Sequence, residues 1–100
     1  MSVSRQVLER TVERRVASWA DKHGIEHIKL NIMGNRGFPD RLFLFSRGRP
    51  LFIEFKRPGG VPRKLQEFKI ERLRKLGYVV HVCDNAADGI AILQSALETA

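Results

Sequence analysis

The sequence contains little that would cross-link a fold or interrupt it. Cys83 is the only cysteine, which excludes an intrachain disulfide, and His23, His27 and His81 lack the ligand spacing of a zinc site. Only four prolines and eight glycines occur among 100 residues, so the composition gives no sign of low complexity, repeats or disorder. A single compact domain over residues 1–100 is therefore expected.

Long hydrophobic runs are also missing. The first fifteen residues carry four arginines amid acidic residues and have no apolar centre, so they fit neither a secretory signal nor a membrane span. The expected location is the cytoplasm, where association with the nucleoid is one possibility.

Acidic side chains are outnumbered by basic ones. Eighteen Lys and Arg against eleven Asp and Glu give a formal charge of +7 and a pI near 10.3. Such an excess favours a polyanionic partner, because binding releases the partner's counterions. Nucleic acid is the expected partner, and the alternative on charge alone is a merely soluble surface.

A strand, a turn and a second strand are predicted in the middle of the chain. The apolar runs R-L-F-L-F and L-F-I-E-F are rich in strand-forming residues, and S-R-G-R-P lies between them as a turn. The segment G-F-P-D ends directly before the first run, and the second run ends in E-F-K. Asp40, Glu54 and Lys56 are thereby placed at one end of a hairpin.

The register of this hairpin decides whether its polar side chains meet. With the turn centred on Gly48, Asp40 lies opposite Lys56 and Leu42 lies opposite Glu54. Cross-strand partners share a face, as do residues two apart on one strand. Asp40, Glu54 and Lys56 are therefore expected to converge, whereas a slip of one residue would turn Asp40 to the other face.

Two carboxylates and an amine suit the metal-assisted hydrolysis of a phosphodiester. Mg²⁺ binds through one or two carboxylates together with waters and phosphate oxygens, and Asp40 with Glu54 could supply that pair. Lys56 would orient the nucleophile or offset charge in the transition state. A charged pair two apart on a strand is often only solvated, but this strand is apolar on both faces, where charges are costly unless they serve a ligand.

An amphipathic helix is predicted at residues 4–23, with Ser2 or Ser4 as its N-cap. Glu9 and Glu13 lie inside its apolar arc or at the edge of it, where a carboxylate needs a partner. Glu13 is either a third acidic member of the site or an exposed partner of a nearby arginine. Glu9 is the weaker candidate of the two.

The remaining elements follow from hydrophobic periodicity. They are a strand at 25–32, a helix that starts after a basic break and ends near residue 76 or 77, a strand at 78–83 and a helix at about 86–97. Asp84 or Asn85 is expected to cap the last helix, with Ile90, Leu93 and Leu97 on its apolar edge. The result is an α/β fold with a mixed four-stranded sheet flanked by helices.

The helix after the basic break carries several residues of interest. Leu65, Ile70, Leu73 and Leu76 are expected on its apolar arc, and Phe68 lies outside the arc as a candidate contact for a second subunit. Gln66, in the first turn, either reaches a metal-bound water or a site carboxylate, or has its amide in solvent. Basic residues around the site are the candidates for phosphate contacts. They are Arg36, Arg41, Arg57, Arg63 and Lys64.

These motifs resemble the PD-(D/E)xK nuclease superfamily, and more closely its virus-type replication-repair nuclease (VRR-Nuc) family. The likeness covers nearly the whole chain. It rests, in this order, on G-F-P-D-R, E-F-K followed by P-G, L-Q, and L-R-K-L-G. The resemblance implies a restriction-endonuclease-like αβββαβ core, here with an extra C-terminal helix. It also implies that Asp40 and Glu54 bind Mg²⁺ or Mn²⁺, that Lys56 assists the attacking water and that Gln66 supports the site.

The resemblance also bears on the third carboxylate and on the substrate. Archaeal Holliday junction resolvases of the superfamily carry a first-helix glutamate eleven residues before the glycine that closes the helix, a position held here by Glu13 before Gly24. This favours Glu13 over Glu9 as a catalytic and metal-binding residue. Single-domain phage members of the family resemble these resolvases in forming homodimers that cut four-way DNA junctions.

The resemblance as a whole implies a metal-dependent, structure-selective DNA endonuclease, which would act as a homodimer and could work in the cytoplasm of a phage-infected host. Two alternatives stay open. One is a flap or nicking nuclease with little structure preference, and the other is a non-catalytic basic DNA-binding module on the same fold.

Overall fold

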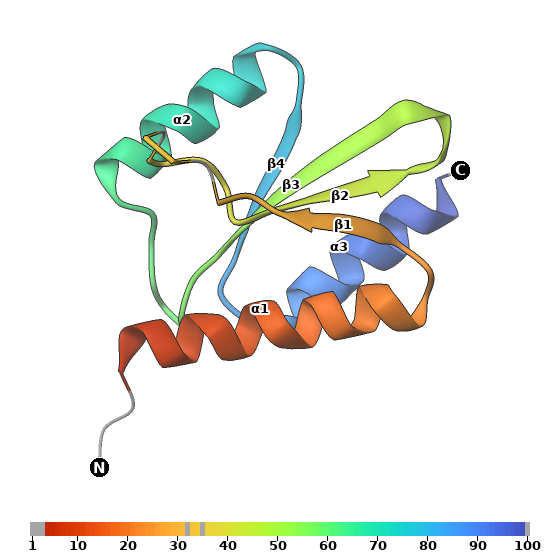
Figure 1. Cartoon of the computed structure of the whole chain (residues 1–100), viewed down its shortest axis with the longest axis horizontal. Helices are drawn as coiled ribbons and strands as arrows, with labels where there is room; N and C mark the ends of the chain where they lie inside the picture. The colour runs from red at the N-terminus through yellow and green to blue at the C-terminus, as the bar shows by residue number, and fades with distance from the viewer. Residues whose placement is uncertain (1–3, 32, 35, 100) are drawn as a thin grey trace.

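A computed structural model describes residues 4–31, 33–34 and 36–99 of the chain (Figure 1). A 3₁₀ turn at Ser46–Gly48 joins the second and third strands. The order of helices and strands predicted from the sequence is confirmed. The elements are α1 (Arg5–Lys22), β1 (Glu26–Lys29), β2 (Arg41–Phe45), β3 (Arg49–Phe55), α2 (Lys64–Lys75), β4 (Val79–Cys83) and α3 (Ala86–Glu98).

The four strands form one mixed sheet in the order β1-β2-β3-β4. The pairs β1–β2 and β2–β3 are antiparallel, whereas β3 and β4 are parallel. A parallel pair needs a crossover connection, which α2 supplies. Figure 1 shows α1 and α3 on one side of the sheet and α2 on the other. Strand β3 is therefore covered on both faces, which explains its apolar sequence.

Each face of the sheet has its own apolar core. Ile53 and Phe55 of β3 pack with Val16 of α1 on one face, whereas Phe52 packs with Ile70 of α2 on the other. Because successive strand residues alternate between faces, Glu54 belongs to the α2 face of β3. The one charged position within β3 beyond its first residue is thereby aimed toward the start of α2.

The hairpin turn is centred on Arg47, so the predicted pairing through Gly48 was wrong. Leu42 pairs with Phe52 rather than with Glu54. The cause is a turn in which Arg47 and Gly48 both take positive φ angles of 65°. The register differs from the prediction by two residues, and an even shift keeps every side chain on its predicted face. Extended past the end of β2, the observed register sets Asp40 opposite Glu54 instead of Lys56.

The ends of the first two elements follow their local chemistry. The Ser4 hydroxyl accepts a hydrogen bond from the Val7 amide at 3.2 Å, which confirms Ser4 as the N-cap of α1. The alternative cap, Ser2, lies outside the described residues. Strand β1 ends at Lys29, earlier than predicted, and Ile32 also lies outside the described residues.

The predicted apolar arc of α2 was too long. Ile70 and Leu73 are buried against the sheet, but Leu65 is 52% exposed and Leu76 is 68% exposed. These two leucines lie in the first turn and at the C-cap, beyond the part of the helix that the sheet covers. Leu97, predicted on the apolar edge of α3, is likewise exposed. None of the helices described by the structure has the length and apolar character needed to cross a membrane.

Gly37 brings the loop before β2 close to α2. A Cβ atom at this position would lie 2.9 Å from the Leu65 carbonyl oxygen, and the φ angle of Gly37 is +94°. Only glycine accommodates both the approach and the conformation without strain. The following Pro39 is buried, so Asp40 leaves this contact at a defined point beside the end of β3.

Candidate active site

Glu54 is the most deeply buried charged residue of the site, with 2% of its surface exposed. Its Oε2 atom accepts a hydrogen bond from Gln66 Nε2 at 2.7 Å and lies 3.3 Å from Lys56 Nζ. Its Oε1 atom is buried and has no hydrogen-bond partner among the described residues. A buried oxygen without a partner is costly, so Glu54 has one coordination position to offer.

The pKa values of Glu54 and Asp40 are both raised above their ordinary values. Burial, followed by the nearby charge of Asp40, raises the pKa of Glu54 to about 8, against the lowering effect of Lys56. Burial also raises the pKa of Asp40, although the Phe55 amide lowers it. A cation beside the two carboxyl groups would offset both the burial and the charge that disfavour their ionisation.

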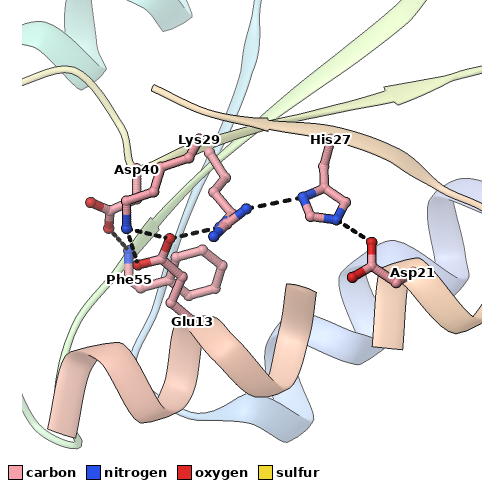
Figure 2. Close-up of polar contacts among 7 residues, drawn as sticks. Glu13, Asp21, His27, Lys29, Asp40 and Phe55 are labelled. Carbon is pink, nitrogen blue, oxygen red and sulfur yellow. Dashed lines mark hydrogen bonds and ion pairs between the residues drawn. The ribbon is translucent and has the colours of Figure 1, made fainter. Parts of the chain in front are cut away.

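Asp40 is oriented by the strand next to it. Its Oδ2 atom accepts a hydrogen bond from the Phe55 backbone N–H at 2.7 Å (Figure 2). This amide lies beyond Arg41 and Ile53, the last pair of the β2–β3 ladder, so the carboxylate binds the strand where the backbone pairing stops. Asp40 is thereby fixed to the residue between Glu54 and Lys56.

Lys56 is buried, with 6% of its surface exposed, which is unusual for a lysine. Its backbone N–H donates to the Cys83 carbonyl at 2.8 Å and so continues the pairing of β3 with β4. Its Nζ lies 3.3 Å from Glu54 Oε2 and 3.9 Å from Glu9 Oε1. The ammonium is held between a carboxylate of the sheet and one of α1.

Gln66 closes the site from the α2 side. Its Oε1 accepts a hydrogen bond at 2.8 Å from the backbone N–H of Arg63, the N-cap residue of the helix. Because the oxygen faces that donor, the amide NH₂ must face Glu54, whose carboxylate can accept it. Of the two interpretations left open by the sequence, the structure has the amide on a site carboxylate rather than in solvent.

Glu13 is buried and paired with two cations. Its Oε2 accepts from Arg41 Nε at 2.6 Å and from Lys29 Nζ at 3.0 Å. The expectation of an exposed partner is wrong, because the arginine comes from β2 and the carboxylate is covered. Glu13 and Asp40 line one pocket, and the charge of Glu13 raises the pKa of Asp40.

The cations predicted to touch phosphate are in different situations. Arg36 and Arg63 are exposed and line a pocket of about 490 Å³ together with Gln66, at the α2 side of the site. Lys64 is exposed, and the Arg57 guanidinium donates to the Pro58 carbonyl. Arg41, by contrast, is committed to Glu13 within the protein.

The family model of the VRR-NUC domain matches residues 3–87, which is most of the chain. The chain belongs to the VRR-NUC domain family. The resemblance noted in the sequence is thereby confirmed.

Relatives of this VRR-NUC chain agree with that result. It is similar to the protein titled "Putative nuclease p44" of Acyrthosiphon pisum secondary endosymbiont phage 1, with 36% identity over 81 residues, 81% of this chain and 87% of that protein. A solved structure titled "VRR_NUC domain" has a TM-score of 0.77 and 28% identity, and covers 86% of this chain and 94% of its own. Another, titled "VRR_NUC domain protein", has a TM-score of 0.79 at 24% identity over 92% and 89% of the two chains, a likeness of fold.

The donor set of this VRR-NUC site suits a hard divalent cation. No group of three His, Cys, Asp or Glu side chains is spaced for a metal within residues 4–31, 33–34 and 36–99. Asp40 and Glu54 remain as two oxygen donors, and the unpartnered Oε1 of Glu54 is the atom that lacks an interaction. Mg²⁺ uses one or two carboxylates and completes its shell with waters and phosphate oxygens, so the residues fit it.

Two residues that contact the site were missed in the sequence. Lys29 reaches Glu13, and His27 reaches Arg41, both from β1. The signal was present, because His27 and Lys29 are two apart on a strand and share a face. It could be used only with the pairing of β1 to β2, which the sequence did not provide.

Proposed function

We propose that this protein is a metal-dependent, structure-selective DNA endonuclease that hydrolyses phosphodiester bonds in branched DNA, with Holliday junctions as the preferred substrate. The observation that carries the proposal is the pairing of half-buried Asp40 with buried Glu54, whose Oε1 has no partner among the described residues. A non-catalytic DNA-binding module would gain nothing from a carboxyl group whose pKa is raised to about 8 in its interior.

Asp40 and Glu54 would hold Mg²⁺ or Mn²⁺, and Glu13 is proposed as a third acidic member next to Asp40. When bound, the ion would polarise the scissile phosphate and lower the pKa of a water ligand. Gln66 keeps the Glu54 carboxylate in one orientation through Nε2. Lys56, beside Glu54, orients the attacking water and offsets charge that develops on the phosphate.

A homodimer would present two such sites to the two symmetry-related strands of a four-way junction. The formal charge of +7 supports a DNA partner. Phe68 on α2 is 62% exposed, which supports its proposed role in a subunit contact. Specificity would come from DNA shape and phosphate contacts rather than from base edges.

A substrate panel tests the function. Purified protein is incubated in Mg²⁺ and in Mn²⁺ with a synthetic four-way junction, 5′ and 3′ flaps, a linear duplex and single-stranded DNA. Paired symmetric cuts in the junction, at a higher rate than in the other substrates, are expected. Equal cutting of all substrates would point to a nicking nuclease without structure preference, and no cutting in either metal would refute the enzyme.

Arg36 and Arg63 give a separate prediction about DNA binding. Changing either one to alanine should weaken junction binding in Ca²⁺. It should also make the negative slope of the logarithm of the association constant against the logarithm of salt concentration shallower by about one. Fluorescence anisotropy over a series of salt concentrations measures both effects. The matched control is Arg47→Ala, an exposed arginine in the hairpin turn at the far end of β2 from Asp40. A slope that Arg47→Ala lowers as much as Arg63→Ala does would contradict the assigned surface.

A further inference from the structure

A line of polar contacts leads from the end of α1 to Glu13 (Figure 2). Asp21 Oδ1 lies 2.7 Å from His27 Nε2, and Arg41 Nη1 lies 3.1 Å from His27 Nδ1. Arg41 Nε then donates to Glu13 Oε2 at 2.6 Å. The His27 side chain is only 12% exposed, and its ring stacks on Phe43 at a centroid distance of 5.4 Å. The imidazole is thus an inner link of the line.

The donors along this line determine the state of the imidazole. A guanidinium has only N–H donors, so His27 Nδ1 must offer its lone pair to Arg41. Nε2 then carries the ring proton and donates it to the Asp21 carboxylate. His27 is consequently neutral and in the Nε2–H tautomer. A second proton, at Nδ1, would remove the only acceptor that His27 provides for Arg41.

Arg41 affects the site because its largely buried side chain contacts the Glu13 carboxylate. Its side chain is 18% exposed, whereas that of Lys29, the other cation on Glu13, is 54% exposed. Buried charge pairs are screened less than exposed ones, so Arg41 is the stronger determinant of where the Glu13 carboxylate lies. The charge of Glu13 acts in turn on Asp40.

We infer that His27 is a positioning residue of this site. As the neutral Nε2–H tautomer it holds the Arg41 guanidinium against Glu13, and uptake of a proton at Nδ1 releases that guanidinium and lowers the rate of cleavage. The effect on cleavage rests on the proposed nuclease function, whereas the tautomer does not.

The groups around the imidazole act on it in opposite directions. Asp21, from α1, favours a protonated ring, and Arg41, from β2, opposes it. Phe43 of β2 covers one side of the ring, and Lys29 lies on β1, two residues after His27. Of the contacts in the line, the one between Arg41 and His27 depends on an unprotonated ring nitrogen, so protonation of the imidazole is the change that would break it.

Nitrogen NMR on the metal-free protein tests the tautomer without any need for cleavage. In a ¹H–¹⁵N correlation spectrum of the histidine rings at neutral pH, His27 should show a protonated Nε2 and an unprotonated Nδ1. A ring protonated at Nδ1 under these conditions would overturn the inference, whether or not the protein cuts DNA.

Two matched variants test the positioning role. His27→Asn keeps an acceptor where Nδ1 stood and cannot take up a proton, whereas His27→Gln keeps only the donor where Nε2 stood. Cleavage by His27→Asn should remain close to wild type at neutral pH and exceed wild type as the pH is lowered. Cleavage by His27→Gln should fall about tenfold at neutral pH, as expected for loss of a residue that orients a site group.

Signals that do not depend on activity accompany these rates. The Arg41 Nε–H resonance of the metal-free protein should stay protected from exchange in His27→Asn and lose protection in His27→Gln, while both variants unfold at similar temperatures. Equal rates and equal protection in the two variants would reduce His27 to a packing residue and overturn the inference. If the wild-type protein cuts no DNA, the nuclease function is refuted. The exchange protection of Arg41 Nε–H in the two variants would then still decide the role of His27.

Discussion

Asp40→Asn is expected to abolish DNA cleavage while making the metal-free protein more stable. The asparagine Oδ1 can still accept the hydrogen bond that the Phe55 amide now gives to Asp40. The negative charge that raises the pKa of Glu54 is lost, and so is a ligand for a hard cation. Cleavage should fall by about a thousandfold or more.

The gain in stability has a defined pH range. Folding raises the pKa of Glu54 from 4.5 to about 8, so between these values the folded chain binds a proton that the unfolded chain does not. Stability therefore falls as the pH rises through this window. Removing the Asp40 charge lowers that penalty, so the gain should be largest at pH 8 and above and vanish below about pH 3, where both carboxyl groups are protonated in either state.

Thermal unfolding of the metal-free proteins measures this effect. A gain of about 1 kcal/mol corresponds to a rise of about 4–8 °C in Tm for a chain of this size. Glu71→Gln is the control, because Glu71 is an exposed carboxylate paired only with Arg74 in the described part of the chain. It should change neither Tm nor cleavage. An Asp40→Asn variant that still cuts, or that is less stable than wild type at pH 8, would contradict the assignment.

Binding of Mg²⁺ or Mn²⁺ is expected to depend strongly on pH. Because the pKa of Glu54 is raised to about 8, the carboxyl group must release a proton before it can bind the ion below that pH. Affinity should therefore fall about fiftyfold between pH 8 and pH 6, with a slope that approaches tenfold per pH unit at the lower end.

Calorimetry in buffers of different ionisation enthalpy counts the protons released. Close to one proton per ion is expected at pH 6, decreasing toward zero above pH 9. In Glu54→Gln the proton release should disappear and the affinity should drop at every pH. If the wild-type affinity is the same at pH 6 and pH 8, Glu54 is not the proton-linked ligand.

The sequence predicted the fold well because its signals were local. Alternating and helical periodicity, with Ser4 and Asn85 as N-caps, were sufficient for the order of helices and strands. The hairpin register was wrong by two residues because Arg47 takes a left-handed conformation, which side-chain pattern does not reveal. Because a shift of two residues leaves each side chain on the same face of the sheet, Asp40 and Glu54 still converge as predicted.

The surroundings of Glu13 could not be predicted in the same way. Its partners Lys29 and Arg41 are cross-strand neighbours in the β1–β2 pair, and that register depends on a loop rather than on periodicity. The path of α1 over this pair is a matter of tertiary packing. Arg41 was consequently assigned to phosphate and His27 and Lys29 were given no role in the site, although in the structure Lys29 and Arg41 contact the Glu13 carboxylate and His27 contacts Arg41.

The most direct test of the account is the position of a manganese ion in a crystal of the wild-type protein. Anomalous diffraction from crystals soaked in Mn²⁺ should show an ion bound by Asp40 and by Glu54 Oε1, the oxygen that now lacks a partner. The same soak of Asp40→Asn crystals should show no ion there. An ion bound elsewhere, or a wild-type site without manganese at saturating concentration, would contradict the central claim that these two carboxylates form a metal-dependent nuclease centre.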